Sequence, residues 1–307
     1  MADNKLIFKD AEEARDDITK RELKEIRKLY NQWARDIKSE YNSYKMSGGS
    51  DVQKMRELTQ MYYRMRNASK QLSADINSRI NIGINDMSNI TVAVNKRWLS
   101  SLGIKDISKF DTRFSYAKNI AVRNIITGNL YSDKKPLSER IWNISQGHDR
   151  DIYNIISMGI AQDMSVYDIA KMLEKYVNPQ ARVPWTVKTY EQNGVTKIVS
   201  VHNRKVDYNA YRLARTMIQH SYQSTLIAIT KDNPFVNGYI WHASGGHPCE
   251  LCSDRDGTFY TAEEVPLDHP NGQCTLEVSI DEAKASGNLA EFYMNPIYYP
   301  DAFASGS

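Results

Sequence analysis

The sequence has no long apolar run and few glycines, prolines or cysteines. None of its 307 residues lies in a stretch approaching the about 20 unbroken apolar residues that span a bilayer. Residues 1–5 also lack the basic and then apolar start of an export signal. We therefore expect a soluble protein made inside the cell. Only 15 glycines and 9 prolines exclude a collagen-like or low-complexity chain, and an aromatic content of 10% argues against full disorder.

The charge is unevenly distributed along the chain. Residues 1–241 carry 38 Lys and Arg against 26 Asp and Glu, whereas residues 242–307 carry 2 against 11. This asymmetry predicts two regions with different neighbours. The basic part could face nucleic acid or an acidic protein surface, although most individual charges are expected only to solvate exposed faces.

Two long amphipathic helices are predicted at the front of the chain. Apolar residues alternate at steps of three and four from about residue 9 to 46, which is the spacing of a helix packed on another helix. A turn at 47–50 separates this helix from a second one that begins at Asp51. The apolar stripes of the two helices contain Leu23, Ile26, Tyr30, Trp33 and Ile37 in the first, and Met55, Leu58, Met65, Leu72 and Ile76 in the second.

The remainder is predicted to be mostly helical, with one β-hairpin. Helices are expected over 107–127, 136–144 and 150–159, over a segment capped by Ser165 that ends near Tyr176, and after Asp207. Two β-branched runs flank an Asn-Gly turn within 185–201, which predicts a hairpin. Residues 238–241 are expected to form a short strand.

The fold class expected from these patterns is mainly α, with a small α+β subdomain stapled by zinc near the C-terminus. We divide the chain into an N-terminal helical region at 1–100, a helical middle domain at 101–235, a Cys/His zinc-knuckle subdomain at 236–283 and a C-terminal tail at 284–307.

The cysteines indicate a metal site. All three cysteines lie within 26 residues, and an odd number cannot pair completely in disulfides. Cys249 and Cys252 are separated by two residues, so that one tight turn can aim both thiolates at one point. His269 and Cys274 follow after a short loop. A Cys₃His set suits tetrahedral Zn²⁺ in a closed, structural site.

The same residues leave open alternatives to a structural zinc site. His242 and His247 are competing ligands, and free cysteines without metal are the plain alternative. The zinc deaminase signature requires a His-x-Glu that the sequence lacks before Cys249. Residues 268–271 faintly match the start of an HNH-type nuclease, so a zinc-dependent nuclease or toxin-like enzyme stays open as the alternative function. We expect no catalytic residues and no small-molecule substrate.

Three stretches resemble the phage minor head (minor capsid) proteins of the Mu F type, a head morphogenesis family. The resemblance covers about residues 136–277, and its most specific part is Pro266-Leu267-Asp268-His269-Pro270-Asn271-Gly272-Gln273-Cys274. Weaker similarity lies at 137–171 and 214–216. The family usually ends this motif with His-Pro-Asn-Cys-Arg-Cys; here Gly272 replaces the first of those two cysteines, which leaves Cys249, Cys252, His269 and Cys274 as the only complete ligand set.

The resemblance implies a structural protein of a tailed phage or prophage, made in the host cytoplasm and built into the virion head. Such proteins assemble with portal or capsid proteins near the portal vertex, and some contact packaged DNA or aid its delivery. The resemblance does not point to a membrane partner or to catalysis.

Overall fold

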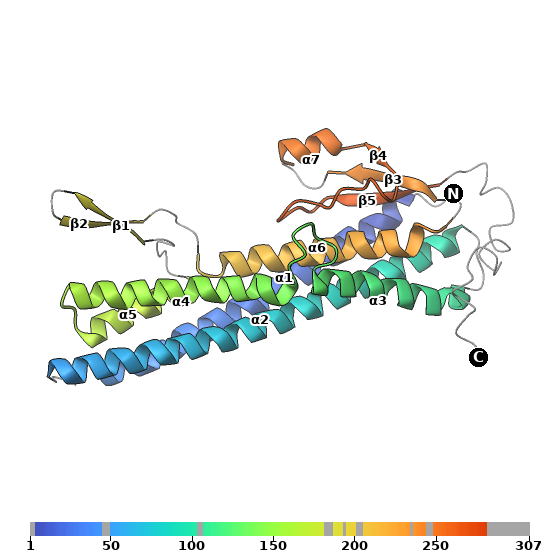
Figure 1. Ribbon diagram of the computed structural model, residues 1–307. Coiled ribbons are helices and arrows are strands. Elements are labelled where there is room, and N and C mark those ends of the chain that lie inside the picture. Colours follow the sequence, from blue (N-terminus) through green and yellow to red (C-terminus); the bar gives the residue numbers. More distant parts are fainter. Residues whose placement is uncertain are drawn as a thin grey trace. The chain divides into compact units, whose positions relative to one another are not determined.

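The computed structural model describes residues 4–44, 50–102, 107–180, 187–192, 195–200, 205–233, 236–243 and 248–280. The fold in these residues is mainly helical with a small antiparallel sheet, as the sequence predicts (Figure 1). The predicted tail at 284–307 and the position of His247 lie outside the described residues. Among the residues that the structure describes, no helix is both long and apolar enough to cross a membrane.

The chain forms two compact units, each assembled from separate stretches of sequence. Unit 1 comprises Met1–Arg21, Ile80–Pro136 and Leu213–Ser307, and unit 2 comprises Glu22–Arg79 and Leu137–Arg212. The two long helices α1 (Asn4–Tyr44) and α2 (Asp51–Ser101) contribute residues to both units. Residues 82–94 are part of α2.

Unit 2 packs α4 (Leu137–Ala161) and α5 (Val166–Val177) against its parts of α1 and α2. Tyr30 and Trp33 of α1 meet His148 of α4 with ring centroids 5.7 Å apart in both pairs, and Tyr176 of α5 completes this aromatic cluster. The predicted inward residues Ile26 and Ile37 of α1, and Leu58, Met65, Leu72 and Ile76 of α2, are buried.

Three details of unit 2 bear on the sequence predictions. The two helices predicted at 136–144 and 150–159 are one continuous helix, because the buried stripe of α4 runs without a break past Gly147. Met55 is 49% exposed rather than buried. The cap at Ser165 is confirmed, since its hydroxyl accepts a hydrogen bond from the backbone N–H of Asp168.

The predicted hairpin is confirmed as β1 (Val187–Gln192) and β2 (Val195–Ser200) in antiparallel register. The pair Gln192 and Val195 lies at its closed end, which leaves the two residues of the predicted Asn-Gly turn between the strands. Residues 193 and 194 themselves lie outside the described residues.

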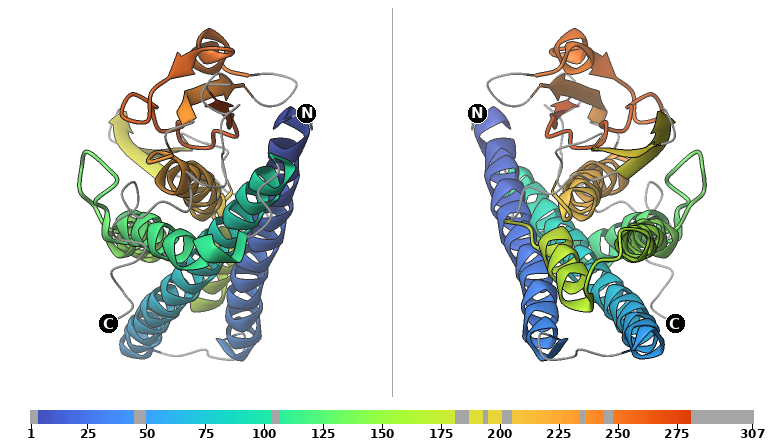
Figure 2. Two further views of the ribbon diagram at one scale, coloured as in Figure 1. Left: turned by 90° about the vertical axis from the view of Figure 1, so that its right-hand side faces the viewer. Right: turned by 90° about the vertical axis from the view of Figure 1, so that its left-hand side faces the viewer.

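Unit 1 places a three-stranded antiparallel sheet over the long helix α6 (Tyr208–Thr230, of which Leu213 onward belongs to this unit). The strand order is β4 (Phe259–Tyr260), β3 (Val236–His242) and β5 (Thr275–Ile280), and α7 (Glu250–Arg255) lies on the side of the sheet away from α6 (Figures 1 and 2). The short helix η1 (Ile107–Phe110) leads into α3 (Asp111–Thr127).

The core of unit 1 joins the sheet to the helices and includes two of the three cysteines. Its buried members are Ala11, Ile18, Met87, Val94, Trp98, Leu99, Phe110, Phe114, Ile218, Tyr222, Leu226, Ile229, Tyr239, Trp241, Cys252, Cys274, Leu276 and Val278. Cys252 and Cys274 are therefore part of a well-packed interior, whereas Cys249 and His269 are not members of this core.

Candidate metal centre

Cys249 and Cys252 are positioned by the start of α7. Cys249 is the residue just before the helix, with extended backbone angles, and its carbonyl oxygen accepts a hydrogen bond from the N–H of Ser253 at 2.9 Å. Cys252 lies in the first turn and is buried, whereas Cys249 is exposed. One helical turn thus turns both sulfur atoms towards the same point, as the two-residue spacing predicts.

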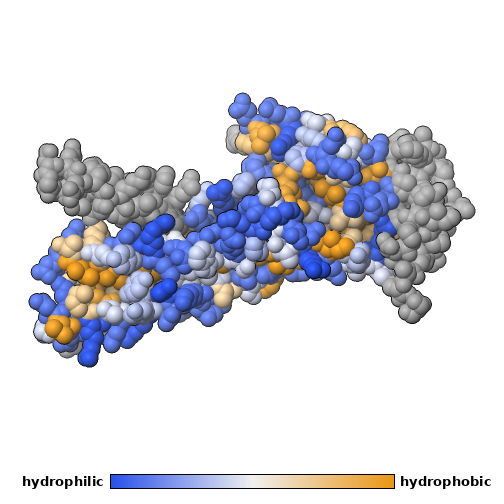
Figure 3. All heavy atoms as spheres, in the orientation of Figure 1, coloured by the Kyte–Doolittle hydropathy of each residue, from blue (hydrophilic) through white to orange (hydrophobic). Residues whose placement is uncertain are grey.

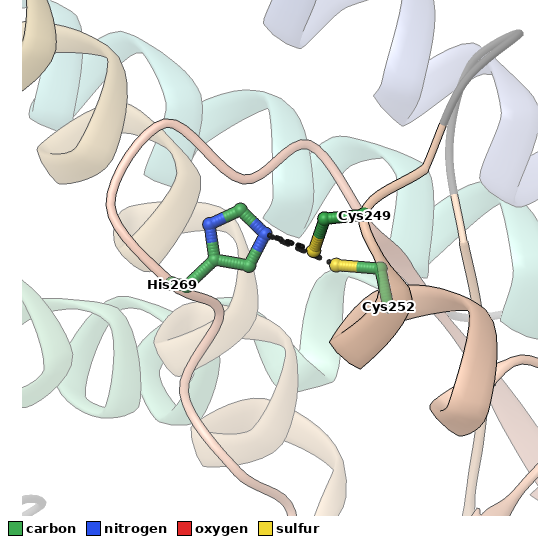
Figure 4. A group of neighbouring side chains, drawn as sticks. All are labelled: Cys249, Cys252 and His269. Atoms are coloured by element: carbon green, nitrogen blue, oxygen red, sulfur yellow. Dashed lines mark hydrogen bonds between the residues drawn. The ribbon is translucent and has the colours of Figure 1, made fainter.

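His269 and Cys274 come from the loop between β4 and β5, and this loop returns to α7 (Figure 4). The Nε2 atom of His269 lies 3.3 Å from the Sγ atom of Cys249 and 3.1 Å from that of Cys252. The Sγ atom of Cys274 lies 3.3 Å from that of Cys252. The ligand atoms of Cys249, Cys252 and His269 all lie within 4.8 Å of one another.

These distances are compatible with metal binding. Two sulfur ligands of a tetrahedral zinc ion, each bonded at about 2.3 Å, are about 3.8 Å apart. The four predicted residues are therefore brought together into possible metal-binding groups. Cys252 links them, because it also forms a second group with Cys274 and Asp268.

Asp268 organises the ligand loop. It is buried, and its carboxylate accepts hydrogen bonds from the backbone N–H groups of His269 at 2.8 Å and Cys274 at 3.0 Å. The same carboxylate accepts a third hydrogen bond, at 3.0 Å, from the side-chain amide of Gln219. Since both carboxylate oxygens are engaged in this way, Asp268 fixes the backbone of two ligands and leaves the four soft donors as the natural ligand set.

Side chains of helix α6 hold this loop in place through hydrogen bonds. His220 Nε2 donates to the carbonyl oxygen of Asp268 at 2.9 Å, and Gln223 accepts from the backbone N–H of Asp268 at 3.0 Å. The Thr216 hydroxyl accepts from the N–H of Asn271 at 3.1 Å. Four polar side chains, including Gln219, thus fall on two successive turns of α6 and satisfy backbone groups that the loop would otherwise bury without partners.

Arg15 of α1 reaches the same loop from another side. Its side chain is buried, and Nη1 donates to the carbonyl oxygens of Gln273 at 2.8 Å and Cys274 at 3.3 Å, and to Gln219 at 3.0 Å. A buried guanidinium brings positive charge next to a ligand set that would carry a net negative charge with zinc. The other side of this guanidinium pairs with Asp16 at 3.1 Å and Glu12 at 3.8 Å, so Arg15 supports the loop chiefly through its hydrogen bonds.

Gly272 is required by the packing of the loop. A Cβ atom added there would lie 2.1 Å from the carboxylate of Asp268. The preceding Asn271 adopts a φ of 70°, a left-handed conformation that asparagine tolerates better than most residues. Position 272 therefore accommodates glycine and no larger residue without displacing Asp268.

Three of the candidate ligands, the exposed Cys249, the buried Cys252 and the half-buried His269, have shifted pKa values. Hydrogen bonds from the backbone and thiol of Cys252 lower the pKa of Cys249, and the adjacent imidazole of His269 lowers it further. Burial would lower the pKa of His269, but its hydrogen bond to the carbonyl oxygen of Pro270 and the charges of Asp268 and Cys249 raise the pKa overall. Burial raises the pKa of the Cys252 thiol. Metal binding would have to displace this proton.

His242, the described competing ligand, is not part of the cluster. It lies at the end of β3, where its Nε2 atom is 2.7 Å from the carboxylate of Glu277 in β5. Two further buried histidines also lie outside the cluster: His148 is a core residue of unit 2, while His220 supports the ligand loop.

The sequence reasoning missed the residues that support the ligands. Asp268 directly precedes His269, and this adjacency could have marked it as a residue that supports the site. Arg15, Gln219 and Gln223 are far from the cysteines in sequence, and no local pattern marks them. In comparisons with known proteins, no family model matches the chain, and no curated protein and no solved structure matches it.

Proposed function

We propose that Cys249, Cys252, His269 and Cys274 bind one Zn²⁺ ion that has a structural role. Three thiolates and an imidazole are soft and borderline donors that favour zinc over hard cations such as Mg²⁺. Four protein ligands complete a tetrahedron and leave no position for a reacting water. The proposal rests on two groups of possible ligands that share Cys252, one with Cys249 and His269 and the other with Cys274 and Asp268.

On this basis we propose that the protein is a structural minor head protein of a tailed phage or prophage, which works by binding and not by catalysis. The support is the resemblance of the ligand loop to the Mu F-type motif, together with a proposed four-ligand donor set of the kind that stabilises a binding module. Portal and capsid proteins are its proposed partners in the virion head, with packaged DNA as a further contact of its basic part.

Metal analysis of the purified full chain tests the ligand set. We expect one zinc per chain, and we expect loss of zinc and a lower melting temperature for Cys252→Ser. Ser253→Ala and His242→Ala are matched controls, because Ser253 is the next residue in α7 and His242 is the competing histidine; both should keep zinc. A wild-type chain without zinc, or a Cys252→Ser variant that melts identically, would refute the proposed site.

Mass spectrometry of purified phage particles from an induced lysogen that encodes this chain tests the virion role. We expect the chain in filled heads, in far fewer copies than the major capsid protein. Its absence from particles would refute the proposal. Metal-dependent cleavage of duplex DNA by the wild type that is lost in His269→Ala would instead support a nuclease and overturn the view that the protein acts by binding alone.

A further inference from the structure

Unit 2 carries an unusual set of exposed apolar side chains on two neighbouring helices. Val52, Met55 and Tyr63 of α2 and Tyr153 and Ile160 of α4 are all exposed, with 57% of Tyr63 and 59% of Tyr153 accessible. We call these five residues the tyrosine face. In Figure 3, hydrophobic side chains gather where the start of α2 adjoins the end of α4.

The face is continuous because α2 and α4 run antiparallel along it. Lys54 pairs with Asp163 at 2.7 Å, and Arg66 pairs with Asp149 at 3.4 Å further along the same two helices. Between these pairs the ring of Tyr62 meets that of Tyr153 edge to face, with centroids 6.3 Å apart. This register sets Met55 opposite Ile160 and Tyr63 beside Tyr153.

The surroundings of the tyrosine face carry a small excess of positive charge, with Asp51 as an exposed acid beside Val52. Arg56 and Lys70 are exposed on the same side of α2, while the carboxylates of Asp149 and Asp163 are paired with cations. Across unit 2 as a whole, the sequence contains 22 Lys and Arg against 15 Asp and Glu. An occupant of the face should therefore present apolar side chains within an acidic surface.

The chain itself presents such a surface on the metal module of unit 1. Residues 248–280 contain 7 Asp and Glu against one Arg. Leu251 and Phe259 are 47% and 48% exposed, and the acidic Glu250 and Asp254 are exposed beside Leu251 on α7. We call Glu250, Leu251 and Asp254 the α7 face, and Phe259 of β4 is a second exposed apolar side chain of the same module. The α7 face matches the tyrosine face in both requirements, an apolar anchor and opposite charge.

We propose that the α7 face of one molecule docks on the tyrosine face of a second copy of the same chain. Because the two surfaces differ, the contact is head-to-tail, and each copy in a pair keeps its other surface for a further neighbour. Such a contact builds rings when its rotation closes and open chains when it does not. Tyrosines that pack against Leu251 provide the binding energy, and the opposite charges orient the pair.

The proposal is tested with the full-length, zinc-loaded chain by sedimentation and light scattering over a range of protein and salt concentrations. We expect association that grows with protein concentration and weakens with salt, since exposed charges are screened. Tyr63→Ser with Tyr153→Ser removes one surface, and Leu251→Ser with Asp254→Ser removes the other. Each double variant alone should associate at least about tenfold more weakly than the wild type.

The decisive result comes from mixing the two double variants. Each keeps the surface that the other has lost, so an equimolar mixture should form dimers and nothing larger. The control Tyr116→Ser with Ile120→Ser, which alters two exposed side chains of α3, should associate as the wild type does. Zinc content should be unchanged in all variants, so that failure of this proposal is distinguishable from failure of the metal site.

Three outcomes would overturn the head-to-tail contact. A zinc-loaded wild type that stays monomeric at high micromolar concentration would mean that the tyrosine face serves a different partner. Stable dimers of either double variant alone would indicate an isologous contact. A mixture that remains monomeric while the wild type associates would show that the two faces do not bind each other.

Discussion

Gly272 has no side chain because the Asp268 carboxylate occupies the place where one would begin. Gly272→Ala should force Asp268 away from the backbone N–H groups of His269 and Cys274, since the added Cβ atom would lie 2.1 Å from the carboxylate. We expect a loss of about 1–3 kcal/mol in the free energy of unfolding and a weaker affinity for zinc, measured by denaturation and by chelator competition.

Gly257→Ala is the matched control for this substitution. Gly257 has a φ of 74°, so that alanine is strained there, but nothing lies within 4 Å of the added Cβ atom. We expect a loss of about 1 kcal/mol in stability with no change in zinc affinity. Equal zinc affinities for the two variants would show that Asp268 does not position the ligands.

His148 provides a pH-dependent contribution to the stability of unit 2. Burial among aromatic rings lowers the pKa of His148 to about 4, against about 6.5 in an unfolded chain. The unfolded state therefore binds more protons between these two values, and stability falls as pH decreases from about 6.5 to about 4. Relative to His148→Phe, the wild type should lose about 3 kcal/mol between pH 7 and pH 4, measured by urea denaturation.

His148→Phe itself is the control, because it cannot titrate but keeps an aromatic ring in the cluster. Carboxylate titration elsewhere affects both proteins and cancels in the comparison. Parallel pH profiles for the two proteins would mean that His148 is protonated in the folded state or accessible to water.

At the scale of secondary-structure elements, the N-terminus of α5 depends on one hydroxyl. Ser165 accepts from the backbone N–H of Asp168 and also donates to its carboxylate at 2.6 Å. Ser165→Ala should cost about 1 kcal/mol in the free energy of unfolding, measured by denaturation, since it leaves a helix-terminal donor without this partner. Ser165→Asp should restore most of the loss; an alanine variant as stable as the wild type would contradict the role of the cap.

Elements with a complete local pattern could be predicted from the sequence. The cap at Ser165, the start of α2 at Asp51 and the register of the β1–β2 hairpin each follow from a few adjacent residues. Helix α4 could not be bounded correctly, because Gly147 looks like a break and only tertiary packing shows that the buried stripe continues past it.

The candidate metal ligands could be predicted because they lie close together in the sequence, and the residues that support them could not because they lie far away. Cys249 and Cys252 share one turn and signal their chemistry by spacing. Arg15 and Gln219 act on the ligand loop from positions more than 50 residues away from Cys274. Their contribution depends on how the chain folds back on itself, which no local pattern records. The prediction for Met55 was wrong for a different reason: its helical spacing matches the buried stripe, but its side chain is exposed.

At the scale of the whole molecule, zinc should stabilise the two units unequally. The proposed ligands all belong to unit 1, where Cys252 and Cys274 are part of the core together with Trp241 and Leu276. Unit 2 has its own core around Tyr30, which contains none of the ligands. Removing the ion would leave neighbouring thiolates in a packed interior, where they must take up protons or repel one another. The loss of stability should therefore fall on unit 1.

Hydrogen exchange of the full chain, with and without a chelator, checks this expectation. Residues 248–280 should exchange much faster after zinc removal, because backbone N–H groups such as those of His269 and Cys274 are bonded to Asp268 only while the loop is fixed. Residues 22–40 and 137–180 should keep their protection. Equal loss of protection in both units would show that the ion stabilises the molecule as one cooperative unit, and no loss in either would show that the loop is held without it.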